Sequence, residues 1–236
     1  MRKYIYILVI GLTMSACTNS EQTGITISVL EDVTESDFIA RPDTQAIRLL
    51  LDLEKNPWQA TTFRYGAISS LVHNKRSSVT LGGGTALMGN QLERDDEIGQ
   101  FFTKMGAILS QPKDSTVHQY SSIWKPIVQE LKVLQKDSFN QITLSVYSDL
   151  QENNGDWFSV HRYKDLMLLE KSPEKVKALF LQEASGVIKG NSNIKVVVVY
   201  QPRTIQQDKA FTMMRKLYTA VFEELGIPIQ FISNLD

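Results

Sequence analysis

Residues 194–200 read Ile-Lys-Val-Val-Val-Val-Tyr, and this run restricts the possible folds more than any other segment. Consecutive valines favour a β-strand, and a strand that is apolar on both faces must be covered on both. Strands of this kind are typical of the centre of a parallel sheet, where helices connect one strand to the next. The run therefore predicts an α/β protein.

Segments of strand character alternate with segments of helical periodicity along the rest of the chain. Strands are expected at 25–31, 62–72, 78–81, 141–147, 194–200 and 227–233. Helices are expected at 44–56, 93–109, 123–136, 173–183 and 208–225, and a loop at 153–159. This order predicts a doubly wound, mostly parallel six-stranded sheet with helices on both faces and one antiparallel edge strand from a hairpin.

The first residues are typical of an export signal. Arg2 and Lys3 precede an apolar core at 4–14, which is too short to span a membrane. The small residues that follow end in Met14-Ser15-Ala16-Cys17. This order resembles the lipobox of bacterial lipoprotein signal peptides, a family in which the chain is cut before the cysteine and the cysteine is acylated.

Cleavage at that point gives a signal peptide at 1–16, an acylated Cys17 with a polar tether at 17–24, and one domain at 25–236. We therefore expect an exported protein that a lipid anchors to a membrane of the bacterial cell envelope. Cleavage removes two of the 25 basic residues and leaves 23 against 26 acidic residues, a net charge of −3. This balance, without a dense basic block, argues against nucleic acid as a partner.

Two of the predicted strands lead into an aspartate. The strand at 25–31 leads into Asp32-x-Thr34-x-Ser36, and the strand at 141–147 leads into Ser148-Asp149. Ligands of open α/β sheets bind beyond the carboxyl ends of the strands, so neighbouring strands would bring both aspartates to one crevice. Carboxylate and hydroxyl oxygens suit Mg²⁺ or Mn²⁺. The same residue types are also common in turns and helix caps that hold no metal.

The motif Asp32-x-Thr34-x-Ser36 resembles the metal-ion-dependent adhesion site (MIDAS) of von Willebrand factor A (vWA) domains. The order of strands and helices predicted over 25–236 is also similar to theirs. In that family an aspartate after the fourth strand completes the charged ligands. Asp149 stands at that place, followed by Leu150 where the family has glycine. The resemblance implies a vWA-like domain that binds Mg²⁺ or Mn²⁺ through Asp32, Thr34, Ser36, Asp149 and one further hydroxyl.

In vWA domains this further hydroxyl belongs to a Thr or Ser in a loop that precedes a helix. Ser121 fits best, because it stands just before the helix expected at 123–136, and Thr116 comes second. Thr85, in Gly84-Thr85-Ala86-Leu87, matches the letters of the family's loop more closely. It follows a hairpin strand and comes early in the chain, so it is the third choice.

The resemblance implies a protein-binding module rather than an enzyme. With two charged ligands the cation would keep an open position and attract an acidic residue of a partner protein, as it does in the adhesion domains. One alternative is a metal-dependent hydrolase of phosphate esters, which needs a general base near the cation. Glu31, Glu35 and Glu152 are the nearest carboxylates by sequence, and Glu31 is expected on the opposite face of its strand from Asp32. Another is a structural vWA-like domain without metal.

The sequence contains no zinc-protease, P-loop or Gly-x-Ser-x-Gly signature. The pair Trp157-Phe158, in the loop expected at 153–159, is the candidate for an exposed aromatic contact with a partner.

Overall fold

The structure is a computed structural model that describes residues 24–34, 38–68, 76–87, 89–112, 120–139, 141–191 and 193–235. The predicted signal peptide, Cys17, Ser36 and Thr116 lie outside these ranges. Within them, no helix has the length and apolar character needed to cross a bilayer.

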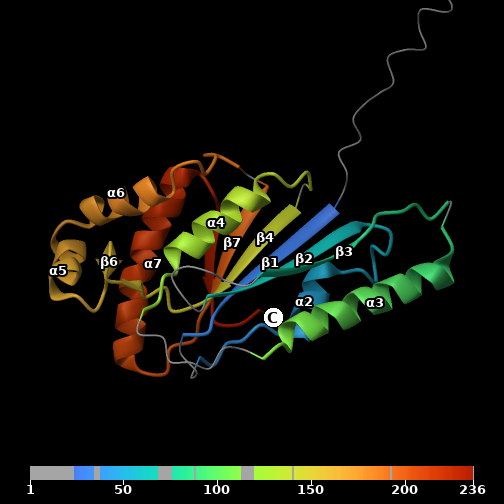
Figure 1. The fold of residues 1–236 in the computed structure, drawn as a ribbon, viewed down its shortest axis with the longest axis horizontal. Coiled ribbons are helices and arrows are strands. Elements are labelled where there is room, and N and C mark those ends of the chain that lie inside the picture. Colours follow the sequence, from blue (N-terminus) through green and yellow to red (C-terminus); the bar gives the residue numbers. More distant parts are fainter. Residues whose placement is uncertain are drawn as a thin grey trace, which may run out of the picture.

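Six strands form one sheet in the order β3-β2-β1-β4-β7-β8. Figure 1 labels β3, β2, β1, β4 and β7 side by side. Every neighbouring pair is parallel except β2 and β3, which form an antiparallel hairpin at one edge. The bounds are β1 Gly24–Asp32, β2 Ala60–Ile68, β3 Arg76–Leu81, β4 Gln141–Tyr147, β7 Ile194–Val199 and β8 Ile229–Ile232. The predicted fold class, a doubly wound and mostly parallel sheet with one antiparallel edge strand, is confirmed.

Helices cover both faces of this sheet (Figure 1). One face packs against α2 (Thr44–Leu51) and α3 (Gln91–Leu109). The other packs against α4 (Trp124–Leu134), α6 (Pro173–Glu183) and α7 (Ile205–Leu225), with α5 (Tyr163–Lys171) beside α6. Alternation along β1 places Ile27 and Val29 on the α2 side and Leu30 on the α4 side. Each face therefore has its own apolar core.

Helix α2 is shorter than predicted. It ends at Leu51 because Asp52 adopts the left-handed conformation, with φ 45°. The side-chain amide of Gln59 donates to the Leu51 carbonyl at 2.7 Å and satisfies a carbonyl at the helix end. The helix thus stops five residues before position 56, its expected end.

The prediction of a loop at 153–159 is wrong in part. β5 (Asn153–Asn154) and β6 (Phe158–Ser159) form a two-stranded ribbon, and α5 follows it without having been predicted. Two-residue strands are too short to leave a periodic pattern in the sequence. Trp157, between the two strands, is partly buried, and its ring centroid lies 4.8 Å from that of Phe180. It is therefore part of the core packing, and not the exposed aromatic side chain that was considered for partner contact.

Candidate functional site

The two aspartate-bearing strand ends lie side by side. β1 and β4 are neighbours in register, with Glu31 opposite Tyr147, so that Asp32 and Ser148 come next on the two strands. The chain leaves β1 toward β2 on one side, and it leaves β4 toward β7 on the other. The strand order therefore reverses between β1 and β4, and such a point is the usual ligand position in an open α/β sheet.

Asp32 is 1% exposed, and both of its carboxylate oxygens are engaged. Oδ1 accepts hydrogen bonds from the Thr34 backbone N–H at 3.0 Å and from the Thr34 hydroxyl at 2.6 Å. Oδ2 accepts a bond from the Ser148 hydroxyl at 3.0 Å. The carboxylate is therefore fixed from both strand ends, as the neighbouring positions of β1 and β4 require.

Ser121 joins this group from a third segment. Its Oγ lies 3.4 Å from the Thr34 Oγ1. Ser121 is held by two backbone hydrogen bonds to Asn153, one in each direction, at 3.1 and 2.8 Å. Asp32 Oδ1, Thr34 Oγ1 and Ser121 Oγ thus form a row of three oxygens contributed by two separate segments.

Asp149 lies at the same edge, 4% exposed, but it is engaged within its own turn. Its Oδ1 accepts from the Gln151 backbone N–H at 2.8 Å, and its Oδ2 accepts from the Gln151 side-chain amide at 2.6 Å. The charges of Asp149, Asp32 and Glu152 all raise the pKa of the buried Tyr218 hydroxyl, in addition to the larger effect of its burial. The three carboxylates therefore lie close enough to this phenol for their charges to act on it.

The structure separates two of the three alternatives for the third segment, Ser121 and Thr85, because Thr116 lies outside the described residues. Thr85 is exposed and follows β3, whose last residue Leu81 pairs with Thr61 near the start of β2. Thr61 in turn pairs with Ile25 near the start of β1. Thr85 therefore lies toward the opposite edge of the sheet from Asp32, while Ser121 lies beside the site.

Leu150 adopts a positive φ of 62° and is fully buried. Its backbone N–H donates to Ser148 Oγ at 3.0 Å, the same atom that donates to Asp32. A non-glycine residue in this conformation costs about 1–2 kcal/mol. Leu150 thus has a backbone conformation that favours glycine, and the strain is offset by burial of the leucine side chain.

This strain predicts an unusual order of stability for two variants. Leu150→Ala and Leu150→Gly both lose a buried side chain, at about 2–5 kcal/mol. Glycine normally costs about 0.5–1 kcal/mol more than alanine, but here it relieves the positive φ. We expect Leu150→Gly to be at least as stable as Leu150→Ala in urea unfolding. A glycine variant clearly less stable than the alanine variant would contradict backbone strain at position 150.

The two acidic residues at the end of β1 have different surroundings. Glu31 accepts from Arg41 Nη1 at 3.0 Å and from the Tyr65 hydroxyl at 2.8 Å, on the α2 side of the sheet. Asp32 faces the other side, as the alternation predicted. Burial raises the pKa of Asp32, although its hydrogen bonds to Thr34 and Ser148 and the charge of Arg41 act in the opposite direction. A cation beside Asp32 would offset this cost of burying its charge.

Glu152 is a buried residue of the site region whose role the sequence did not reveal. Its Oε2 accepts from the backbone N–H groups of Ile123 and Trp124, both at 2.9 Å, and so caps the N-terminus of α4. Burial raises the pKa of Glu152 to about 7 in spite of these bonds. Glu152 is close to Asp149 in the sequence. A helix cap supplied by a residue 29 positions away along the chain leaves no local signal in the sequence.

The row of oxygens fits a small divalent cation. Magnesium binds oxygens at about 2.0–2.1 Å in an octahedron, which places adjacent ligand oxygens about 3 Å apart. The separations of 2.6 Å from Asp32 Oδ1 to Thr34 Oγ1 and 3.4 Å from there to Ser121 Oγ lie on either side of this value. Among the described residues no group of three or more His, Cys, Asp and Glu side chains could hold a metal. Any metal here would thus depend on hydroxyl ligands.

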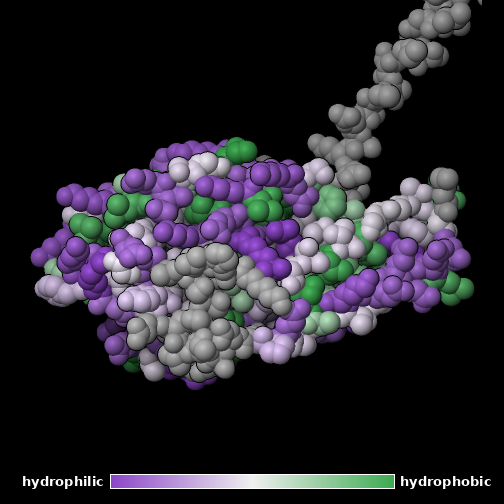
Figure 2. Space-filling view, in the orientation of Figure 1, coloured by the Kyte–Doolittle hydropathy of each residue, from purple (hydrophilic) through white to green (hydrophobic). Residues whose placement is uncertain are grey.

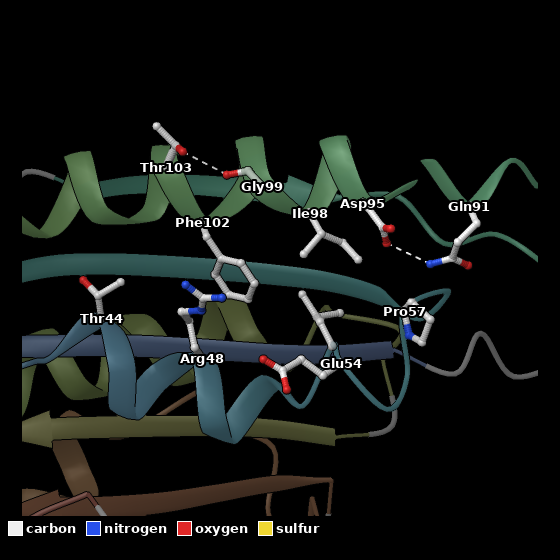
Figure 3. A pocket seen from close by; sticks show the side chains of 11 residues that line it. Thr44, Arg48, Glu54, Pro57, Gln91, Asp95, Ile98, Gly99, Phe102 and Thr103 are labelled. Atoms are coloured by element: carbon white, nitrogen blue, oxygen red, sulfur yellow. Dashed lines mark hydrogen bonds between the residues drawn. The ribbon is translucent and has the colours of Figure 1, made fainter. Parts of the chain in front are cut away.

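A groove of about 490 Å³ lies elsewhere, between α2 and α3 (Figure 3). Its residues come from these two helices and the turn after α2, and the guanidinium of Arg48 lies over the Phe102 ring, 4.5 Å from its centroid. None of the predicted site residues that the structure describes lines it. The groove is therefore separate from the strand-end site.

No family model matches the chain, and no curated protein matches it in sequence.

Proposed function

We propose that this protein is a membrane-anchored, protein-binding module of the vWA-like kind, with a Mg²⁺ or Mn²⁺ site at the carboxyl edge of the sheet. The observation that carries the proposal is the convergence of Asp32, Thr34 and Ser121 at the reversal of strand order. Asp149 and Ser36 are the further ligands that the resemblance to vWA domains implies.

The charges of this site favour binding over catalysis. Asp32 and Asp149 would contribute the negative charge, and the hydroxyl ligands are neutral, so a bound cation would attract an acidic side chain of a partner. A hydrolase would need a free general base beside the cation. Glu31 is engaged by Arg41 and Tyr65 on the other face, and Glu152 uses one of its two carboxylate oxygens to cap α4. Glu35 lies outside the described residues. The hydrolase alternative therefore has less support.

The proposed lipid anchor suits this arrangement. The tether would enter the domain at Gly24, the first residue of β1, while Asp32 is the last residue of that strand. A nine-residue strand is about 26 Å long from first to last Cα. The site would then lie at the far end of the domain from its anchor, where a partner protein could reach it.

Metal titration tests the proposal directly. In calorimetric titrations of the mature chain we expect saturable binding of Mg²⁺ and Mn²⁺. Asp32→Ala should abolish it, because the only carboxylate in the row of oxygens is lost. Thr34→Ala should weaken it at least tenfold, in the range seen when supporting ligands of metal sites are removed.

Thr85→Ala is the matched control, since it makes the same change at the opposite edge of the sheet and should leave metal affinity unaltered. Heat of binding that is absent from the wild type, or equal in the wild type and Asp32→Ala, would overturn the metal site and leave a structural domain. Titration of acidic peptides with and without Mg²⁺ then tests whether the metal binds an acidic partner. Peptide binding of equal affinity in both conditions would contradict this partner chemistry.

A further inference from the structure

A second polar cluster lies away from the strand-end site, where α4 packs against β1 and the β2–β3 hairpin. Glu130 of α4 is 1% exposed. Its Oε1 accepts from the Ser28 hydroxyl at 2.9 Å and from Arg64 Nε at 2.6 Å, and its Oε2 accepts from Arg76 Nη1. The carboxylate is therefore fully engaged by three donors.

The charges in this cluster do not balance. Two guanidinium groups share the single carboxylate of Glu130, which leaves a surplus of one positive charge. Their side chains are still 24% and 26% exposed, so the surplus charge is open to solvent. Among the described residues, the Nη groups of Arg64 donate no hydrogen bond, and the other contact of Arg76 is a long one of 3.5 Å to the Pro126 carbonyl. Donors therefore remain available for an anion.

These donors border a small hollow of about 70 Å³. Arg76 and Ser78 are two residues apart on β3 and so share a face, and Arg64 stands opposite Ser78 in the hairpin. Figure 2 shows a strongly hydrophilic surface over this part of the sheet, beside α4. A water molecule takes about 30 Å³ in the liquid, so the hollow has room for two waters or one small oxyanion.

We propose that Arg64, Arg76 and Ser78 bind the phosphoryl group of a small phosphate-type anion. Guanidinium groups match the oxygens of phosphate and carboxylate with paired, charge-assisted hydrogen bonds. Here the donors come from two strands and include a hydroxyl, an arrangement that suits a tetrahedral anion better than a planar carboxylate. Glu130 is a positioning residue that fixes both guanidinium groups. This site is independent of the proposed metal site, since it shares no residue with it.

Binding would neutralise the surplus charge and join the hairpin more firmly to α4. A ligand that binds only the folded chain raises its stability with concentration. We therefore expect inorganic phosphate to raise the melting temperature of the mature chain saturably, at constant ionic strength kept with sodium chloride. Titration calorimetry should give the same dissociation constant. Acetate should give at most a tenth of the phosphate affinity.

Two arginine variants separate a built site from general attraction of anions. Arg76→Gln should weaken phosphate binding at least tenfold, because one charged pair of donors is lost. Arg48→Gln makes the same change in net charge at the α2–α3 groove and should leave the affinity unaltered. Equal effects of the two substitutions would overturn the proposal, as would acetate binding as tightly as phosphate.

Arg76→Gln removes one partner of the buried Glu130 carboxylate and so risks unfolding the chain. A further variant avoids this risk. Ser78→Ala leaves all three donors to Glu130 in place, since the exposed Ser78 hydroxyl is not one of them. It should weaken phosphate binding severalfold without changing the melting temperature in chloride. Unchanged phosphate affinity in Ser78→Ala, or no saturable effect of phosphate on the wild type, would refute the site.

Glycerol 3-phosphate distinguishes a phosphate ester from free phosphate as the natural ligand. Affinity equal to that of inorganic phosphate would support a site that reads the phosphoryl group of an ester, such as a lipid headgroup. Affinity at least tenfold weaker would support a site for free phosphate.

Discussion

Replacing Trp124 with alanine is expected to lower the free energy of unfolding by about 3–5 kcal/mol. Trp124 is fully buried at the start of α4, and its ring centroid lies 5.5 Å from Phe180, 5.4 Å from Tyr218 and 5.7 Å from Phe222. Its indole N–H donates to the Phe180 carbonyl at 2.8 Å. Alanine would leave a cavity among three aromatic rings and a buried carbonyl without its donor, so the loss combines packing and hydrogen bonding.

Thermal unfolding measures this prediction. A loss of this size in a domain of about 200 residues corresponds to a fall in melting temperature of roughly 6–20 °C. Trp124→Phe keeps most of the ring contacts and loses the hydrogen bond, so it should fall between the wild type and Trp124→Ala. A melting temperature of Trp124→Ala within 2–4 °C of the wild type, about 1 kcal/mol, would show that α4 is not fixed by this cluster.

The fold was predictable where the sequence carries a periodic pattern. The helix expected at 173–183 is α6, with the same bounds, because Ser172-Pro173-Glu174 is a clear start signal. The helix expected at 208–225 begins earlier, at Ile205, because the Thr204 hydroxyl accepts from the Gln207 N–H and caps it there. The apolar stripe predicts the body of a helix, while a cap decides its first residue.

The candidate site was predictable only in part, for the same reason. Local spacing indicated Asp32, Thr34 and Asp149, and the order of elements indicated that their strands meet. Ser121 was the first choice for the third segment because it precedes the helix expected at 123–136. Its place beside Thr34 depends on its bridge to Asn153, a pairing that leaves no mark in either segment alone. The cluster of Arg64, Arg76 and Glu130 joins residues 66 and 54 positions apart, and no motif announces it. Contacts between polar side chains that are far apart in the sequence can be recognised only in the folded structure.

Replacing Glu152 with glutamine is expected to stabilise the protein at pH 8 by up to about 3 kcal/mol and to change little below pH 4.5. The pKa of Glu152 is raised from 4.5 to about 7 in the folded chain, chiefly by burial. Between these values the native state binds the proton more tightly than the unfolded state. The contribution of Glu152 to stability is therefore greatest below pH 4.5 and is lost as the pH rises to 7, above which the carboxylate is charged in both states.

Glutamine keeps the oxygen that accepts from Ile123 and Trp124 and removes the charge, so its stability should lack this fall. Urea unfolding from pH 4.5 to 8, with divalent metal chelated, measures the difference between the two proteins. Glu170→Gln, on the exposed side of α5, is the control and should follow the wild type at each pH. A difference between Glu152→Gln and the wild type that is constant with pH would contradict a titrating carboxylate. A difference that grows with pH would show that the buried charge of Glu152 destabilises the folded chain.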